Sequence, residues 1–100
     1  MKRFSNEQVT LITQRARALS DPTRVRIIEA LARDAQSVGT LAGVLDCEPS
    51  TVSRHLQILF NAHMVERRRE ASTVIYSLGR PELIGWCRYL AVTDFPVATS

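Results

Sequence analysis

Residues 40–63 read TLAGVLDCEPSTVSRHLQILFNAH, and this stretch contains two helical patterns separated by a short break. The first pattern lies near Thr40–Leu45. The second covers about Pro49–His63 and repeats apolar residues at four- and three-residue spacing, as one face of a helix requires. Between them, Asp46-Cys47-Glu48 interrupts the pattern, and Pro49 suits the first position of a new helix because it needs no N–H there. Two helices joined by a three-residue break are typical of a helix-turn-helix motif.

Two further helices are predicted before this motif. Ser5, with Gln8 three residues later, has the pattern of a capping box, which begins a helix. Asp21 and Pro22 suit the N-cap and first position of the next helix. We expect that second helix to turn apolar side chains inward and to keep its arginines largely outside. The inward residues are Val25, Ile28, Leu31 and Ala32, and the outer ones are Arg24, Arg26 and Arg33.

After Met64 the apolar period changes from helical spacing to strict alternation. Residues 73–78 alternate in this way, which predicts a half-buried strand. Residues 64–70 can pair with it in antiparallel fashion, with Ala71-Ser72 at the tip. A hairpin that directly follows a helix-turn-helix is a wing, so the sequence predicts a wing with a cationic flank.

A last helix is predicted from Pro81 to about Val92, which completes a mainly α fold with a β-hairpin wing. This is a winged helix-turn-helix with the element order α-α-α-α-β-β-α. One small core cannot cover the apolar faces of both the first and the last helix, so we expect a homodimer that buries these faces. The expected interface residues are Val9, Ile12, Ala16, Leu83, Trp86, Cys87 and Leu90.

The composition indicates one globular domain with a basic surface. One hundred residues suffice for a single domain, expected at 1–93, with a short tail at 94–100 that frays. No apolar run is long enough to span a membrane, and the polar start lacks a signal-peptide core, so we expect a cytoplasmic protein without a membrane partner. Lysine and arginine outnumber acidic residues by 13 to 10, and Lys2 is the only lysine. Arginine presents a planar fork of donors that matches phosphate groups and guanine edges.

Three segments resemble the ArsR/SmtB family of winged helix-turn-helix repressors. ALSDPTRVRIIEAL at 18–31 is similar to that family's second-helix signature, and STVSRHL at 50–56 to the core of its recognition helix. VIYSL at 74–78 looks like its second wing strand. The three segments stand in the right order and spacing, and the resemblance covers roughly residues 8 to 92. It implies a homodimer that binds a twofold-symmetric operator in double-stranded DNA, usually as a repressor that an inducer releases.

By position, the resemblance implies that Ser50, Thr51, Ser53 and Arg54 face DNA. Short hydroxyl side chains in a first helical turn suit phosphate contacts, and Arg54 is long enough to reach the N7 and O6 atoms of guanine. In the wing, alternation prevents three consecutive arginines from facing the same side. The full set expected to contact DNA is Ser50, Thr51, Ser53, Arg54, His55, Gln57, Arg67, Arg68, Arg69 and Ser72.

The chain also departs from the family's pattern. Glu48-Pro49 replaces the common Ser-Gln before the recognition helix, and Ala71-Ser72 stands where the wing tip commonly carries glycine. Metal-sensing members carry a C-x-C pair in the third helix, or an Asp-x-His and a His-x-x-Glu/His pair in the last helix. Neither pattern is present, so we expect no metal and no cofactor. Cys47 and Cys87 are the candidate thiol sensors, and the alternative is a regulator without an inducer.

The favoured function is therefore a sequence-specific DNA-binding transcriptional regulator, a repressor that acts as a homodimer on an inverted-repeat operator. The alternative is a winged-helix module that binds another protein, for which an acidic or apolar recognition helix and wing would be expected. An enzyme is not expected, because the sequence shows no nucleophile–base pair, carboxylate dyad or glycine-rich phosphate loop.

Overall fold

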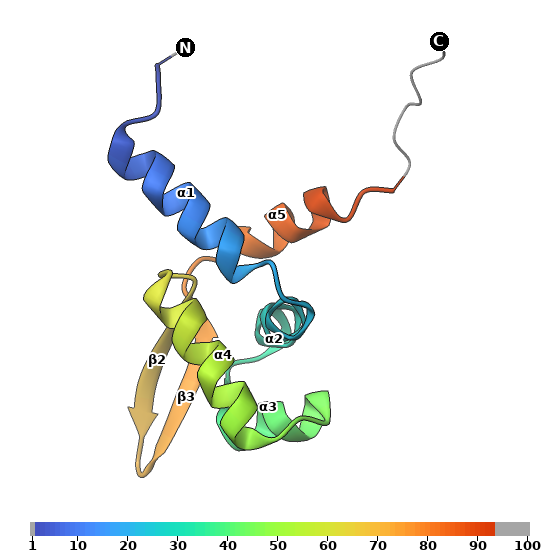
Figure 1. Cartoon of the computed structure of the whole chain (residues 1–100). Helices are drawn as coiled ribbons and strands as arrows, with labels where there is room; N and C mark the ends of the chain where they lie inside the picture. The colour runs from blue at the N-terminus through green and yellow to red at the C-terminus, as the bar shows by residue number, and fades with distance from the viewer. Residues whose placement is uncertain (1, 94–100) are drawn as a thin grey trace.

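The computed structural model describes residues 2–93, so the predicted tail at 94–100 lies outside the described residues. Its elements follow the winged helix-turn-helix order (Figure 1). They are α1 (Asn6–Ala18), α2 (Pro22–Arg33), β1 (Gln36–Ser37), α3 (Val38–Leu45), α4 (Pro49–Asn61), β2 (Val65–Glu70), β3 (Thr73–Leu78) and α5 (Glu82–Leu90). In Figure 1, α1 and α5 project at one end of the molecule, whereas α3 and the β2–β3 hairpin lie at the other end. Within residues 2–93, no helix has the length and apolar character needed to cross a membrane.

The sheet contains one strand that the sequence did not predict. Strands β2 and β3 form the expected hairpin, and β1 adds to the other edge of β3 in the order β1-β3-β2. Gln36 pairs with Tyr76 and Ser37 with Ile75. A strand of two residues has no period to read, and only its partner on β3 makes it a strand. The observed order therefore has β1 inserted between the second and third helices.

Capping side chains determine where α1, α2 and α3 begin. In α1, the Ser5 hydroxyl accepts from the Gln8 backbone N–H at 3.1 Å and the Gln8 side chain accepts from the Ser5 N–H at 2.8 Å, which confirms the capping box. Asp21 caps α2 as predicted, because its carboxylate accepts from the backbone N–H of Arg24. Helix α3 begins earlier than Thr40, because the Ser37 hydroxyl accepts from the Thr40 N–H and places the start at Val38.

The break inside the helix-turn-helix is a Schellman motif, a common way to end a helix. Asp46 adopts the left-handed conformation with φ 52°, and the Cys47 N–H donates to the Ala42 carbonyl at 3.0 Å. Helix α4 ends in the same way, with His63 at φ 59° and the Met64 N–H donating to the Leu59 carbonyl at 3.0 Å. This motif ends α4 at Asn61 rather than at the predicted His63. Helix α5 runs from Glu82 to Leu90, shorter than the predicted Pro81–Val92.

The core lies where α2, α3 and α4 meet, and β3 closes it through Tyr76. Its largest fully buried side chains are Ile27, Ile28, Leu41, Val52, Leu56 and Leu59. The predicted inner face of α2 was partly wrong, since Val25 and Ala32 are exposed while Ile27 and Ala30 are buried. The other two predicted inner residues, Ile28 and Leu31, are buried in the same core as Ile27 and Ala30.

The wing tip carries an alanine in a conformation that favours glycine. Ala71 has φ 54°, in the left-handed region that costs an L-residue roughly 1–2 kcal/mol. We expect Ala71→Gly to raise the free energy of unfolding by about 0.5–1 kcal/mol, because the larger entropy of the unfolded glycine chain offsets part of this cost. The midpoint of thermal unfolding should rise by about 2–8 °C.

Ser72→Gly is the matched control, because the Ser72 backbone is not in the left-handed region. It should give no stabilisation. A midpoint for Ala71→Gly at or below that of the unsubstituted protein would contradict the assigned tip conformation.

Candidate nucleic-acid interface

Helix α4 buries one apolar face and presents a mainly polar face to solvent. Its inner face buries Val52, Leu56 and Leu59, which confirms the predicted register. The outer face presents Ser50, Ser53, Arg54 and Gln57, which are exposed, and Thr51, which is half-buried. Within residues 2–93, the side chains of Ser50, Thr51, Ser53 and Arg54 make no hydrogen bond, so their donors are available to a partner outside the chain.

The first turn of α4 begins at Pro49, and its N-cap residue is Glu48. The Glu48 side chain makes no capping hydrogen bond to this turn. Backbone N–H groups at a helix start favour an anion, whereas a carboxylate at the same place repels one. Glu48 therefore opposes an anionic partner here, in contrast to the hydroxyl side chains that follow it.

In the wing, Arg67 and Arg69 face one side of β2 and Arg68 the other, as alternation predicts. Arg67 lies with its guanidinium 3.8 Å from the centre of the Phe60 ring and donates to the Gln57 side chain at 3.4 Å. It thereby connects the wing to α4. Phe60 was not predicted as a partner, because nothing in its spacing indicates that an arginine would cover it.

The other two wing arginines differ in their surroundings. Arg68 forms an ion pair with Glu70 at 3.0 Å, and both side chains are more than half exposed. Arg69 shares the side of Arg67 and makes no ion pair within the described part of the chain. Ser72 is exposed at the tip. Arg69 therefore carries the less compensated charge of the two, whereas Glu70 offsets much of the charge of Arg68.

His55 does not share the outer face of α4 with the serines and Arg54. Its side chain is only 18% exposed, and its ring lies against the start of α2. Nδ1 is 3.1 Å from Arg24 Nη1, and Nε2 is 3.8 Å from Asp21 Oδ2. The expectation that His55 contacts DNA does not fit this placement. Arg24, expected to lie outside, is instead half-buried and bonded within the chain.

Asp21 is kept ionised beside this histidine. The hydrogen bond from the backbone N–H of Arg24 lowers the pKa of Asp21 below its usual range, with a smaller contribution from the charge of Arg24. An ionised carboxylate is the stronger acceptor for the α2 N-cap.

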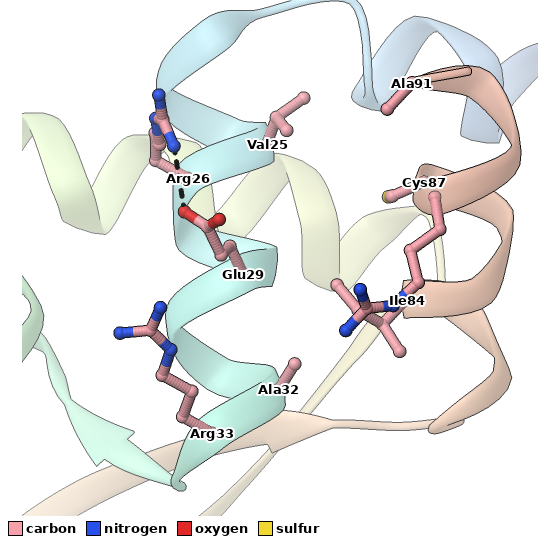
Figure 2. Close-up of a pocket in the computed structure, with 9 residues that line it drawn as sticks. Val25, Arg26, Glu29, Ala32, Arg33, Ile84, Cys87 and Ala91 are labelled. Atoms are coloured by element: carbon pink, nitrogen blue, oxygen red, sulfur yellow. Dashed lines mark hydrogen bonds and ion pairs between the residues drawn. The ribbon is translucent and has the colours of Figure 1, made fainter. Parts of the chain in front are cut away.

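Both cysteines are free thiols and half-buried. Cys47 Sγ lies 3.4 Å from the Leu45 carbonyl oxygen, within the helix-turn-helix break. Cys87 lies on α5 and faces α2 across a groove of about 550 Å³ (Figure 2). Burial raises the pKa of the Cys87 thiol, which disfavours the reactive thiolate. In the described residues, no group of three or more His, Cys, Asp or Glu side chains is placed to hold a metal ion.

The comparisons with known proteins agree with this geometry. The family model described as a helix-turn-helix domain matches residues 19–68. The chain is 34% identical over 88 of its residues to the transcriptional repressor SmtB homolog of Synechocystis sp., covering 88% of this chain and 67% of that protein. It is 37% identical over 73 residues to the regulator KmtR of Mycobacterium tuberculosis, covering 73% of this chain and 56% of that protein. The chain thus spans about half to two thirds of the length of these curated relatives.

A solved structure shares the fold over almost the whole chain. It is the solution structure of a homodimeric winged helix-turn-helix DNA-binding domain from Mycobacterium bovis, with a TM-score of 0.75 and 27% identity. The match covers 91% of this chain and 90% of that one. With the motif match, the similarity to the SmtB homolog and this shared fold, the chain belongs to the ArsR/SmtB family of winged helix-turn-helix transcriptional regulators.

Proposed function

We propose that this protein is a sequence-specific DNA-binding transcriptional repressor that acts as a homodimer on an inverted-repeat operator. The observation that carries the proposal is the outer face of α4, where Ser50, Thr51, Ser53 and Arg54 offer donors that make no hydrogen bond within residues 2–93. Arg69 and Ser72 extend this surface along the wing. Its basic and hydroxyl groups suit contacts with a phosphate backbone and with base edges. A protein-binding module would instead be expected to present an acidic or apolar surface here. We place the protein in the cytoplasm, where it would meet its DNA operator.

Apolar side chains that one chain leaves uncovered support the homodimer. On α1, Val9 and Ile12 are 46% and 44% exposed, and Ala16 is exposed beside them. On α5, Trp86 and Leu90 are 63% and 68% exposed. A second copy that packs α1 and α5 against the same helices would bury these residues, and the Mycobacterium bovis relative is homodimeric.

Two residues of the expected interface contribute less to it than the others. Leu83 and Cys87 are half-buried and pack against the core of their own chain. We therefore centre the proposed interface on Val9, Ile12, Ala16, Trp86 and Leu90.

The test of DNA binding is a mobility-shift titration with the promoter of the protein's own gene and with a random duplex, each over a salt series. A DNA-binding repressor should prefer the promoter, and its affinity for both duplexes should fall steeply between ~50 and ~200 mM salt as phosphate contacts release counterions. Equal affinity for the two duplexes, or no binding to either at low salt, would favour the protein-binding alternative.

Regulation by thiol chemistry is the remaining alternative to a repressor without an inducer. The Cys87 thiol is half-buried against α2, and burial raises its pKa, which disfavours the reactive thiolate and so favours the absence of a thiol switch there. We expect the wild type to stay on its operator when peroxide, polysulfide or arsenite is added, and the Cys47→Ser, Cys87→Ser double variant to behave in the same way. Release of the wild type but not of the double variant would establish a thiol sensor and contradict this expectation.

A further inference from the structure

Helix α1, the proposed dimerisation helix, is bonded to the C-terminal end of α4. Arg15 Nε donates to the Ala62 carbonyl at 3.1 Å, and Gln14 Nε2 donates to the Asn61 carbonyl at 3.4 Å. These carbonyls belong to the last turn of α4, where no further helical N–H can reach them. The end of the proposed recognition helix is therefore held by side chains of α1.

A second connection joins the C-terminal end of α1, close to Gln14 and Arg15, to the middle of α4 through Arg24. Its Nε donates to the Ala18 carbonyl at 2.6 Å and its Nη2 to the Arg17 carbonyl at 3.3 Å, both at the C-terminal end of α1. Its Nη1 lies 3.1 Å from His55 Nδ1 on α4. One guanidinium thus bridges two helices that are distant in sequence.

The chemistry of arginine determines which atom donates and which accepts in the hydrogen bond between Arg24 and His55. Arginine remains charged and can only donate, so His55 Nδ1 must accept and the proton of the neutral ring must lie on Nε2. Nε2 then points towards Asp21 Oδ2 at 3.8 Å. The negative end of the α1 dipole adds to the attraction for the guanidinium. Because three separate nitrogens of Arg24 are used, a lysine with its single ammonium cannot reproduce the bridge.

We infer that Arg24 and Arg15 together set the angle of α4 relative to α1, and so determine which operator half-site spacing the dimer accepts. Arg24 is then a positioning residue that determines specificity without touching DNA. The inference rests on the proposed function, because it needs a dimer joined through α1 and a recognition helix in α4.

The geometry makes spacing sensitive to this angle. Helix α4 has 13 residues, so it is about 20 Å long, and Arg15 holds the end opposite to Ser50. A rotation of about 10° around that end would move the Ser50 end by about 3 Å, which is close to the 3.4 Å rise of one base pair. Two protomers that rotate in the same sense would change the distance between half-sites by about twice this amount. Loss of the bridge should therefore relax the spacing by one or two base pairs.

The experiment measures the affinity of each variant for inverted repeats that keep the same half-sites and change only their separation, one base pair at a time. The wild type should prefer one separation. Arg24→Met, which keeps much of the side-chain length and removes every donor, should lower the preference for that separation over its neighbours by roughly fivefold or more, on the scale of about 1 kcal/mol for one lost hydrogen bond. Arg26→Met is the matched control, because within residues 2–93 the Arg26 side chain bonds only to Glu29 on its own helix, and it should keep the wild-type preference.

Two further readouts separate positioning from a general loss of stability. Arg15→Met removes the other anchor and should relax the spacing in the same way in a protein that sedimentation shows to be folded and dimeric. Nitrogen NMR of the wild type should show His55 protonated on Nε2 alone, and Arg24→Met should shift the Nδ1 resonance, because that nitrogen loses its donor.

An unchanged spacing preference in both Arg24→Met and Arg15→Met would overturn the inference while the proposed function stands. A wild-type His55 protonated on Nδ1 would also overturn it. A wild type that prefers no inverted repeat over a random duplex would contradict the proposed function itself, and this inference with it.

Discussion

Replacing Trp86 and Leu90 with glutamine will convert the proposed dimer into a monomer. Both side chains are more than 60% exposed in the single chain, so a partner must cover them if they are to leave water. A large apolar side chain gains about 1.5–3 kcal/mol on full burial, and each of these two occurs twice in a symmetric dimer. The dissociation constant should therefore rise by at least about 1000-fold. Sedimentation velocity over a concentration series measures this change.

Val44→Gln is the matched control for the dimer prediction. Val44 is 63% exposed, as Trp86 is, but it lies on α3, away from α1 and α5. This control should remain dimeric. A wild type that sediments as a monomer at micromolar concentration would contradict the proposed interface, and so would a double variant that sediments as the wild type does.

The second large effect is expected from Arg54→Ala, which should abolish most sequence discrimination. Arg54 is exposed on the outer face of α4, and its guanidinium makes no hydrogen bond within residues 2–93. A bidentate contact of arginine with guanine is worth about 1–3 kcal/mol of discrimination. Since both protomers contribute one, the ratio of operator to random-duplex affinity should fall by roughly 30-fold or more.

Arg33→Ala is the control for this effect, because it removes the same charge from an exposed position on α2, outside α4 and the wing. It should leave the affinity ratio unchanged. Fluorescence anisotropy with both duplexes at one salt concentration gives the ratio directly. An Arg54→Ala protein that keeps the wild-type ratio would show that another residue reads the bases.

Much of the fold was predictable because its signals are local. Ser5, Asp21 and Pro49 mark helix starts through their own side chains, and the apolar spacing of Val52, Leu56 and Leu59 correctly predicts the inner face of α4. Strand β1 was not predictable, because its two residues become a strand only by pairing with β3. The buried face of α2 was predicted only in part, with Ile28 and Leu31 right and Val25 and Ala32 wrong, because apolar residues on neighbouring faces of one helix leave the choice to the surrounding elements.

In the candidate site, too, features set by the local sequence were predictable and features set by partners on other helices were not. Exposure of Ser50, Ser53 and Arg54 follows from helical periodicity and holds in the structure. The inward turn of His55 and the bridge made by Arg24 could not be read from spacing, because their partners lie on other helices and the acceptors on α1 are backbone carbonyls. A charged residue on an amphipathic helix is ordinarily expected in solvent. Here the backbone carbonyls at the end of α1 accept from the Arg24 guanidinium, so this side chain is half-buried.

The central claim, a symmetric dimer that reads two half-sites with α4, is tested most directly by hydroxyl-radical footprinting of the protein on its promoter. The account predicts two protected segments related by an inverted repeat, with centres about 34–36 Å apart along the duplex or a multiple of that distance. Arg54→Ala should weaken both segments equally. A single protected segment without twofold symmetry, or protection that Arg54→Ala leaves unchanged, would contradict the account.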